Sequence, residues 1–253
     1  MPNKHAVLSA SSSHRWISCP PSARLCAAAG DRPSPYAQQG TDAHSLCEFK
    51  ILSALGRACA DPRENLTFLD SEMEACTDAY CSHVMEQYED AKRRCPDPLI
   101  LIEQRLDFSR WAPSGFGTGD CIIVTDDVLQ VIDFKYGLGV HVSAEDNPQM
   151  RCYALGALDA YGSIYDISTI KMTIFQPRRD NISTSGISRD GLLSWADAVL
   201  SPAARLAYAG SGELKAGEHC RFCSAKASCR EYAGYTHEQA ARDFMPSDAD
   251  KRP

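Results

Sequence analysis

The sequence lacks the features that would place it in a membrane or outside the cell. None of its 253 residues belongs to an apolar run of about 18, the length that a membrane-spanning helix requires. The N-terminal stretch MPNKHAVLSASSSHRW contains no apolar segment of the kind that a secretory signal carries. We therefore expect a cytoplasmic location, in which thiols stay reduced. The twelve cysteines then need an explanation other than disulfide bonds.

Motifs for energy coupling and for reading base sequence are also missing. The chain has no G-x-x-x-x-G-K-[ST] phosphate-binding loop, so we expect no ATP-driven motor on it. It has no helix-turn-helix or zinc-finger pattern that would confer base specificity. The formal net charge of -7 argues against a general nucleic-acid coating protein. It does not exclude an enzyme that acts on DNA, because active-site carboxylates add negative charge that a bound divalent metal offsets locally.

The sequence does contain an ordinary globular composition with a clear order of elements. A hydrophobic content of 44% suits one domain with a buried core. The patterns predict helices near His14 and at 38–55, 71–94, 147–161 and 187–208, and strands at 99–108, 117–125, 128–135 and 168–176. The residues after the last helix are expected to be irregular. A meander of three strands, a crossover helix and a further strand predict an α/β fold with a mixed central β-sheet flanked by helices.

Three charged side chains on two neighbouring strands form a candidate site. Asp120 ends the stretch Gly-Thr-Gly-Asp on one strand, and Asp133 and Lys135 lie at the end of the next. Residues two apart on a strand point to the same face, so Asp133 and Lys135 project together, and the hairpin can bring Asp120 beside them. Two carboxylates and one ammonium group on one face suit Mg²⁺ or Mn²⁺, which also binds phosphate oxygens. The alternative for a lone D-x-K is an ion pair on a solvated strand end.

Further motifs stand before and after these residues. Gly40 precedes His44 in a helical segment, and Gln149-x-x-x-Tyr153 places two side chains on one helix face. Together with Gly117-x-x-Asp120 and Asp133-Phe134-Lys135, this order of motifs resembles the signature of the PD-(D/E)XK nuclease superfamily, in its RecB-type branch. The resemblance covers residues 9–229, which is most of the chain.

The resemblance implies a restriction-endonuclease-like fold and a metal-dependent nuclease. Its metal ligands would be His44, Asp120, Asp133 and the backbone carbonyl of Phe134. Its catalytic residues would be Asp120, Asp133, Lys135, Gln149 and Tyr153. Lys135 would orient the attacking water or stabilise the charge that develops on phosphorus, and Gln149 and Tyr153 would help to place the DNA strand. Glu103, on the preceding strand, either supports this site electrostatically or faces solvent.

Three cysteines near the C-terminus have the spacing of metal ligands. Cys220, Cys223 and Cys229 form C-x2-C-x5-C, in which a turn can bring the first two sulfurs to one side. Cys19 is the best candidate for a fourth ligand, and Cys26 is its competitor. In iron-sulfur members of the RecB-type branch one cysteine precedes the core and three follow it, so the resemblance implies a [4Fe-4S] cluster. Purely thiolate ligation suits Zn²⁺ as well, and His219 could then replace Cys19.

The resemblance also implies a division of the chain and an activity. Residues 1–98 would form a helical part with Cys19 and His44, residues 99–209 the nuclease core, and residues 210–253 a cysteine-rich extension and polar tail, all in one structural domain. We expect a DNA exonuclease that acts on ends in phage-type recombination or repair, in a bacterium or a phage-infected cell. Candidate DNA-binding residues are Arg151, Arg178 and Arg179.

Two expectations about partners and alternatives complete this interpretation. The substrate would be linear DNA, double- or single-stranded, and analogy suggests a single-strand annealing protein as partner. The alternative function is a catalytically idle iron-sulfur or zinc module that only binds DNA.

Overall fold

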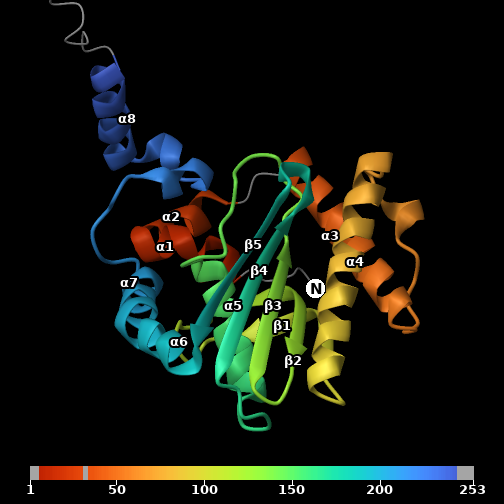
Figure 1. Cartoon of the computed structure of the whole chain (residues 1–253). Helices are drawn as coiled ribbons and strands as arrows, with labels where there is room; N and C mark the ends of the chain where they lie inside the picture. The colour runs from red at the N-terminus through yellow and green to blue at the C-terminus, as the bar shows by residue number, and fades with distance from the viewer. Residues whose placement is uncertain (1–5, 31–33, 244–253) are drawn as a thin grey trace, which may run out of the picture.

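A five-stranded mixed sheet forms the centre of the computed structural model, which describes residues 6–30 and 34–243 (Figure 1). In sheet order the strands are β1 (Leu99–Asp107), β2 (Phe116–Val124), β3 (Val128–Phe134), β4 (Thr169–Gln176) and β5 (Asn181–Ser188). The first three form an antiparallel meander, β4 runs parallel to β3, and β5 is antiparallel to β4. The helix α5 (Pro148–Tyr161) makes the crossover that the parallel pair needs. The expected mixed α/β fold is thus confirmed.

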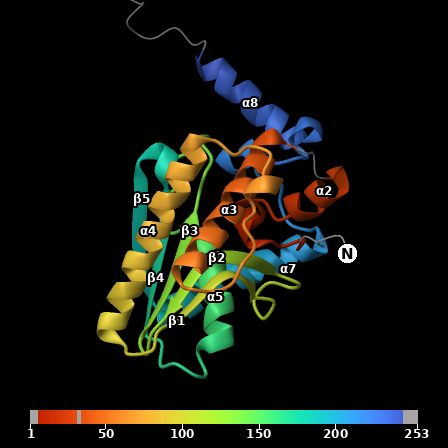
Figure 2. The same ribbon diagram turned by 90° about the vertical axis from the view of Figure 1, so that its right-hand side faces the viewer.

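Helices cover both faces of the sheet, and a hydrophobic core lies on each face (Figures 1 and 2). The helices α3 (Pro35–Ala54) and α4 (Ser71–Arg94) pack on one face, against side chains such as Ile123 and Phe134. On the other face lie α5, α1 (Ser13–Ser18), α2 (Ser22–Ala29), α6 (Arg189–Trp195) and α7 (Ser201–Ala209). The last helix, α8 (Arg230–Asp243), extends away from the sheet at the end of the molecule where α2 lies.

Capping residues set the start of the helices nearest the candidate site. The side chain of Asn147 accepts hydrogen bonds from the backbone N–H groups of Gln149 and Met150 at 3.0 and 3.3 Å, and Pro148 occupies the first turn of α5. At the start of α4, Asp70 accepts from the N–H of Met73 at 2.7 Å. The cap of α5 places Gln149 beside the end of β3, where it contacts Asp133.

The structure corrects the sequence prediction at β5. A helix was expected to begin at Ile187, but residues 181–188 form a strand paired with β4 along its whole length. The strand signal is weak because the sequence NISTSGIS is polar at most positions, and its pairing partner β4 supplies the hydrogen bonds. The helix begins instead at Arg189 and continues through a π-helical segment (Ala196–Leu200) into α7, which holds Pro202 in its first turn.

Two helices were not anticipated. The helix α2 begins directly after Pro20-Pro21, where the missing N–H groups of proline cost nothing. The helix α8 occupies part of the segment that was expected to be irregular, because its polar composition lacks a clear apolar stripe. The polar tail expected after it lies outside the described residues. No helix in the described part of the chain is long and apolar enough to cross a membrane.

Candidate metal centre

Two carboxylates face each other where the strands β2 and β3 end their pairing. Cys121 pairs with Ile132, so Asp120 and Asp133 stand opposite each other one step further along the same register. Both side chains are buried. At this point the backbone N–H of Phe134 donates to Asp120 Oδ2 at 2.6 Å, which ties one carboxylate to the neighbouring strand. The hairpin therefore brings Asp120 beside Asp133, as its spacing in the sequence predicted.

A histidine and a second acid complete a potential ligand group around Asp120. His44, on α3, places Nδ1 3.4 Å from Asp120 Oδ1 and 3.7 Å from Glu103 Oε1. One ligand atom from each of these three residues lies within 4.8 Å of the other two. Imidazole nitrogen and carboxylate oxygen are both ligands for divalent cations. The ring of His44 also packs edge-on against Phe134, which holds it over the strand ends.

Glu103 enters this group through an unusual backbone conformation. It lies in β1 opposite Asp120, between the pairs Ile102–Cys121 and Gln104–Gly119, and its φ of 48° is in the left-handed region. Such a conformation costs a non-glycine residue on the order of 1 kcal/mol or more and tends to persist at functional sites. The sequence left Glu103 between a supporting role and a solvent-facing one, and the structure places its carboxylate beside His44. Its position across the hairpin from Asp120 is the signal that could have shown this.

Asp133 belongs to a second network that adjoins the first. Lys135 Nζ lies 2.9 Å from Asp133 Oδ2 and donates to Gln149 Oε1 at 3.1 Å. The amide of Gln149 donates to Asp133 Oδ1 at 3.1 Å and to the Tyr153 hydroxyl at 3.0 Å. The predicted residues Asp133, Lys135, Gln149 and Tyr153 are therefore joined in one chain of contacts. Asp133 Oδ2 is buried and accepts no hydrogen bond of good geometry, since its contact with Lys135 is an ion pair only.

The charges in this site shift one another's protonation. Burial raises the pKa of Asp133 and the charge of Asp120 adds to this, although Lys135 opposes it. Burial would also raise the pKa of Asp120, but His44 and Lys135 outweigh it and lower that pKa. Burial alone would lower the pKa of His44, yet Asp120 and Glu103 raise it to about 10. The acids thus hold a proton on His44 that a bound cation would replace.

The donor set fits a hard divalent cation. It combines one imidazole with the carboxylates of Glu103, Asp120 and Asp133, and one oxygen of Asp133 is buried and accepts no hydrogen bond. The burial of so much negative charge is costly unless it is paired. Without metal, Lys135 and protonated His44 supply that pairing, and a cation bound by His44, Glu103 and Asp120 would take the place of the His44 proton.

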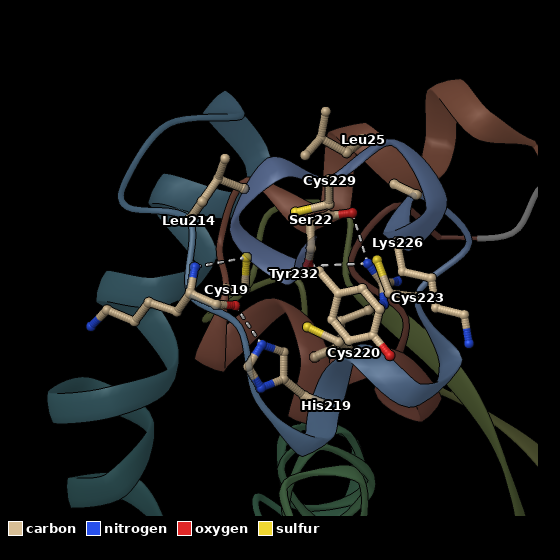
Figure 3. A pocket seen from close by; sticks show the side chains of 13 residues that line it. Cys19, Ser22, Leu25, Leu214, His219, Cys220, Cys223, Lys226, Cys229 and Tyr232 are labelled. Atoms are coloured by element: carbon tan, nitrogen blue, oxygen red, sulfur yellow. Dashed lines mark hydrogen bonds between the residues drawn. The ribbon is translucent and has the colours of Figure 1, made fainter. Parts of the chain in front are cut away.

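The four predicted cysteine ligands line one small cavity between the two ends of the chain (Figure 3). Cys19 follows α1, whereas Cys220, Cys223 and Cys229 lie between α7 and α8. The backbone N–H of Lys215 donates to Cys19 Sγ at 3.5 Å. Arg15, Lys215 and Lys226 line the same cavity and provide positive charge for thiolates. All twelve cysteines lie in the described residues and all are free.

The sulfurs in this cavity do not form a compact group of three. In the described residues no three cysteine sulfurs lie within 4.8 Å of one another. Four thiolates around one Zn²⁺ would lie about 3.8 Å apart, given Zn–S bonds of about 2.3 Å. Cys26 is also close, with its Sγ 3.4 Å from that of Cys223. His219 points its ring to the carbonyl of Lys215 at 2.8 Å and lines the same cavity.

A comparison with known families gives a classification. A family model described as "Protein of unknown function (DUF2800)" matches residues 5–250. The chain belongs to the DUF2800 family. A solved structure described as "Crystal structure of SSO0001" is 11% identical to it, with 74% of this chain and 95% of that chain covered and a TM-score of 0.33. At this level of likeness, conclusions about the DUF2800 chain rest on its own residues.

The three arginines expected to bind DNA already have partners in this DUF2800 protein. Arg151 pairs with Asp146 and lies over the ring of Trp195. Arg178 pairs with Glu72 at 2.9 Å, and its guanidinium lies 4.7 Å from the centre of the Tyr136 ring. Arg179 donates to the carbonyl of Leu138 at 2.9 Å. Their contacts hold loops and helix ends, so a role in DNA binding would require them to exchange these partners.

Proposed function

We propose that this protein is a metal-dependent DNA nuclease of the PD-(D/E)XK type, RecB branch, which hydrolyses phosphodiester bonds at DNA ends. The observation that carries the proposal is the junction of two networks at the strand ends. One network offers His44, Glu103 and Asp120 as cation ligands, and the other presents Lys135 beside Asp133. An ordinary surface ion pair would not bury both carboxylates in this way.

Each side chain has a role that its contacts support. A Mg²⁺ or Mn²⁺ ion held here would act as a Lewis acid toward phosphate and lower the pKa of a bound water. Lys135 would stabilise negative charge on the phosphate or orient the attacking water, since its ammonium group is held between Asp133 and Gln149. Gln149 hydrogen-bonds to both Lys135 and the Tyr153 hydroxyl. It would therefore position the side of the site that faces the DNA strand. The carbonyl of Phe134 remains a candidate ligand.

The cysteine cavity supports the proposal of a [4Fe-4S] cluster bound by Cys19, Cys220, Cys223 and Cys229. The donors are four cysteines that line one cavity, and basic side chains surround them; a single zinc ion is the alternative occupant. The cluster would join the segment around α1 to the segment before α8 and so support residues 99–209 as a nuclease core. Because it would tie two segments that are about 200 residues apart in the chain, we assign the cluster a structural role. A single-strand annealing protein remains the proposed partner.

The central experiment follows cleavage of end-labelled linear DNA with Mg²⁺ or Mn²⁺. We expect wild-type protein to shorten linear DNA and to spare closed circles, while Asp133→Asn and Lys135→Gln lose at least about 100-fold in rate, the scale of losing a charge-stabilising group. Asp159→Asn, which removes an exposed carboxylate on α5, is the matched control and should cleave normally. Equal cleavage by Asp133→Asn and wild type would refute the assignment of the site. DNA binding by wild type without cleavage would instead favour the idle binding module.

A further inference from the structure

A broad hollow lies beside the cysteine cavity and is not used by the proposed cleavage site. It has a volume of about 670 Å³, within the range of ligand-binding clefts. The start of α1 forms one wall, and the segment around Arg221 and the first turns of α8 form another. Val140, from the loop after β3, closes the wall nearest the sheet. Three separate parts of the chain therefore meet at this hollow.

Three aromatic rings line the hollow, and one of them, Phe222, is open to solvent. The side chain of Phe222 is 77% exposed, although it is one of the largest apolar groups in the chain. Tyr232 and Tyr235 lie one turn apart on α8, with ring centroids 6.4 Å apart and planes 28° from parallel. All three line the hollow. An exposed phenyl ring beside two half-buried tyrosine rings offers surfaces on which unpaired bases can stack.

Positive charge gathers around these rings. The lining contains the cations Arg15, Arg221 and Lys226, whereas Glu218 is the one acid among the described lining residues. His14 and His219 add two imidazole rings. This balance is opposite to that of the whole chain, whose net charge is -7. The guanidinium of Arg221 lies 5.6 Å from the centre of the Phe222 ring. A cation beside a stacking ring matches the alternation of phosphate and base along a nucleic-acid strand.

The hollow is connected to the cleavage site by a short stretch of backbone. Arg221 donates to the carbonyl of Gly139 at 3.2 Å, and the neighbouring Val140 lines the hollow. Val140 stands five positions after Lys135 in the chain. A fully extended chain of that length spans at most about 18 Å, so the hollow lies within a few nucleotides of Lys135.

We propose that this hollow binds single-stranded DNA and leads the strand toward Lys135. Duplex DNA would offer phosphates to the cations but no base faces to the rings, because its bases are stacked on one another. A single strand can use both, which is why we assign the hollow to it. The direction of the strand toward Lys135 rests on the proposed nuclease function, whereas the binding itself does not.

The test measures binding in EDTA, where no cleavage occurs. Fluorescence anisotropy of a labelled oligodeoxythymidylate is compared for wild type, Phe222→Ala, Tyr235→Ala and Arg221→Gln. We expect each ring variant to bind about 10-fold more weakly, the effect of losing one stacked base. Tyr36→Ala removes a ring that is 85% exposed on α3, outside the hollow lining, and serves as the matched control. Circular dichroism and metal content check that each variant keeps its fold and cysteine site.

The outcomes separate this inference from the proposed function. Unchanged affinity in Phe222→Ala and Tyr235→Ala would overturn the single-strand assignment. So would an equal loss of affinity for a duplex of the same length, because stacking on the rings would then not be involved. If wild type fails to cleave any DNA but the ring variants lose single-strand affinity, the hollow stands and the nuclease proposal falls. Retained single-strand binding by Asp133→Asn would show that the hollow works independently of the carboxylates.

Discussion

The ring of Tyr153 lies directly against Gly117, so that a Cβ atom at position 117 would stand 2.7 Å from Tyr153 Cε1. This contact explains why glycine stands three residues before Asp120: any larger residue would push α5 away from β2. Tyr153 binds Gln149, and Gln149 binds both Asp133 and Lys135. The glycine of the G-x-x-D motif therefore controls the placement of Gln149, Asp133 and Lys135 through its contact with Tyr153.

The substitution Gly117→Ala tests this relationship. The added methyl group must displace the Tyr153 ring, so we expect a loss of about 1–3 kcal/mol in unfolding free energy, as in other overpacked cores. We also expect cleavage to fall, because Gln149 moves with Tyr153. Urea unfolding and the cleavage assay measure the two effects. Gly40→Ala is the control: its Cβ meets nothing within 4 Å in α3, so helix propensity should raise stability by up to about 1 kcal/mol. Equal stability of Gly117→Ala and wild type would show that the ring has room.

Cation binding should release a proton from His44. With no metal bound, Asp120 and Glu103 raise the pKa of His44 to about 10, so the imidazole is protonated at neutral pH. A metal ligand must be neutral imidazole, and affinity for Mn²⁺ should therefore rise about 10-fold per pH unit between pH 7 and 9. Calorimetry in buffers of different ionisation enthalpy counts the protons released. A His44→Asn variant, which has no such proton, should show a flatter pH dependence. Binding without proton release by wild type would exclude His44 as a ligand.

Two substitutions at Glu103 separate its backbone from its charge. Both Glu103→Gln and Glu103→Gly remove a carboxylate from the ligand group, so both should weaken Mn²⁺ binding. Only glycine relieves the strain of a φ of 48°, and the glycine variant should be about 1 kcal/mol more stable than the glutamine variant. Thermal unfolding and metal titration measure the two properties. If both variants bind Mn²⁺ as tightly as wild type, Glu103 is not a metal ligand.

The fold should lose stability in acid through Glu74. Hydrogen bonds from Arg63 and Lys50 lower the pKa of Glu74 from 4.5 to about 2. Because the folded-state pKa is below the unfolded one, this stabilisation is complete above about pH 4.5 and is lost as the pH falls toward 2. The group is partly exposed, so we expect no more than about 1 kcal/mol. Urea unfolding of Glu74→Gln across this pH range should show a shallower decline than wild type. Arg63→Met should reproduce the change, and a parallel decline in all three proteins would contradict it.

The cysteine site should stabilise the whole protein. A centre that joins Cys19 to Cys220 closes a loop of about 200 residues, for which loop-closure entropy suggests about 5 kcal/mol. We expect Cys220→Ser to lose bound iron and to melt well below wild type. Cys59→Ser, at a half-buried cysteine outside the cavity, should retain both iron and melting temperature. If wild-type protein contains zinc and no iron, the cavity holds a zinc site and the assignment of a cluster is wrong. If Cys220→Ser loses iron but melts at the wild-type temperature, the cluster does not have a structural role.

Much of the fold and part of the candidate site follow from local patterns. The bounds of α4 and the positions of α3, α5 and the first four strands agree with the sequence prediction, because apolar periodicity reports directly which face of an element is buried. The proximity of Asp133 to Lys135 follows from strand geometry, and that of Asp120 follows from a hairpin whose register a short turn restricts. These contacts depend on residues that are near one another in the chain.

Other features were decided only by tertiary structure, because they depend on packing between distant segments. The left-handed backbone of Glu103 has no local signal, and its carboxylate reaches His44 only because α3 packs over the end of β1. The polar strand β5 exists because β4 offers an edge with which to pair. The sequence shows that Arg151 and Arg178 are positively charged, but only the fold shows that Asp146 and Glu72 pair with them. Likewise, Phe222 is one aromatic residue among many until the fold places it in a hollow with the tyrosines of α8, Arg15 of α1 and Val140 of the loop after β3.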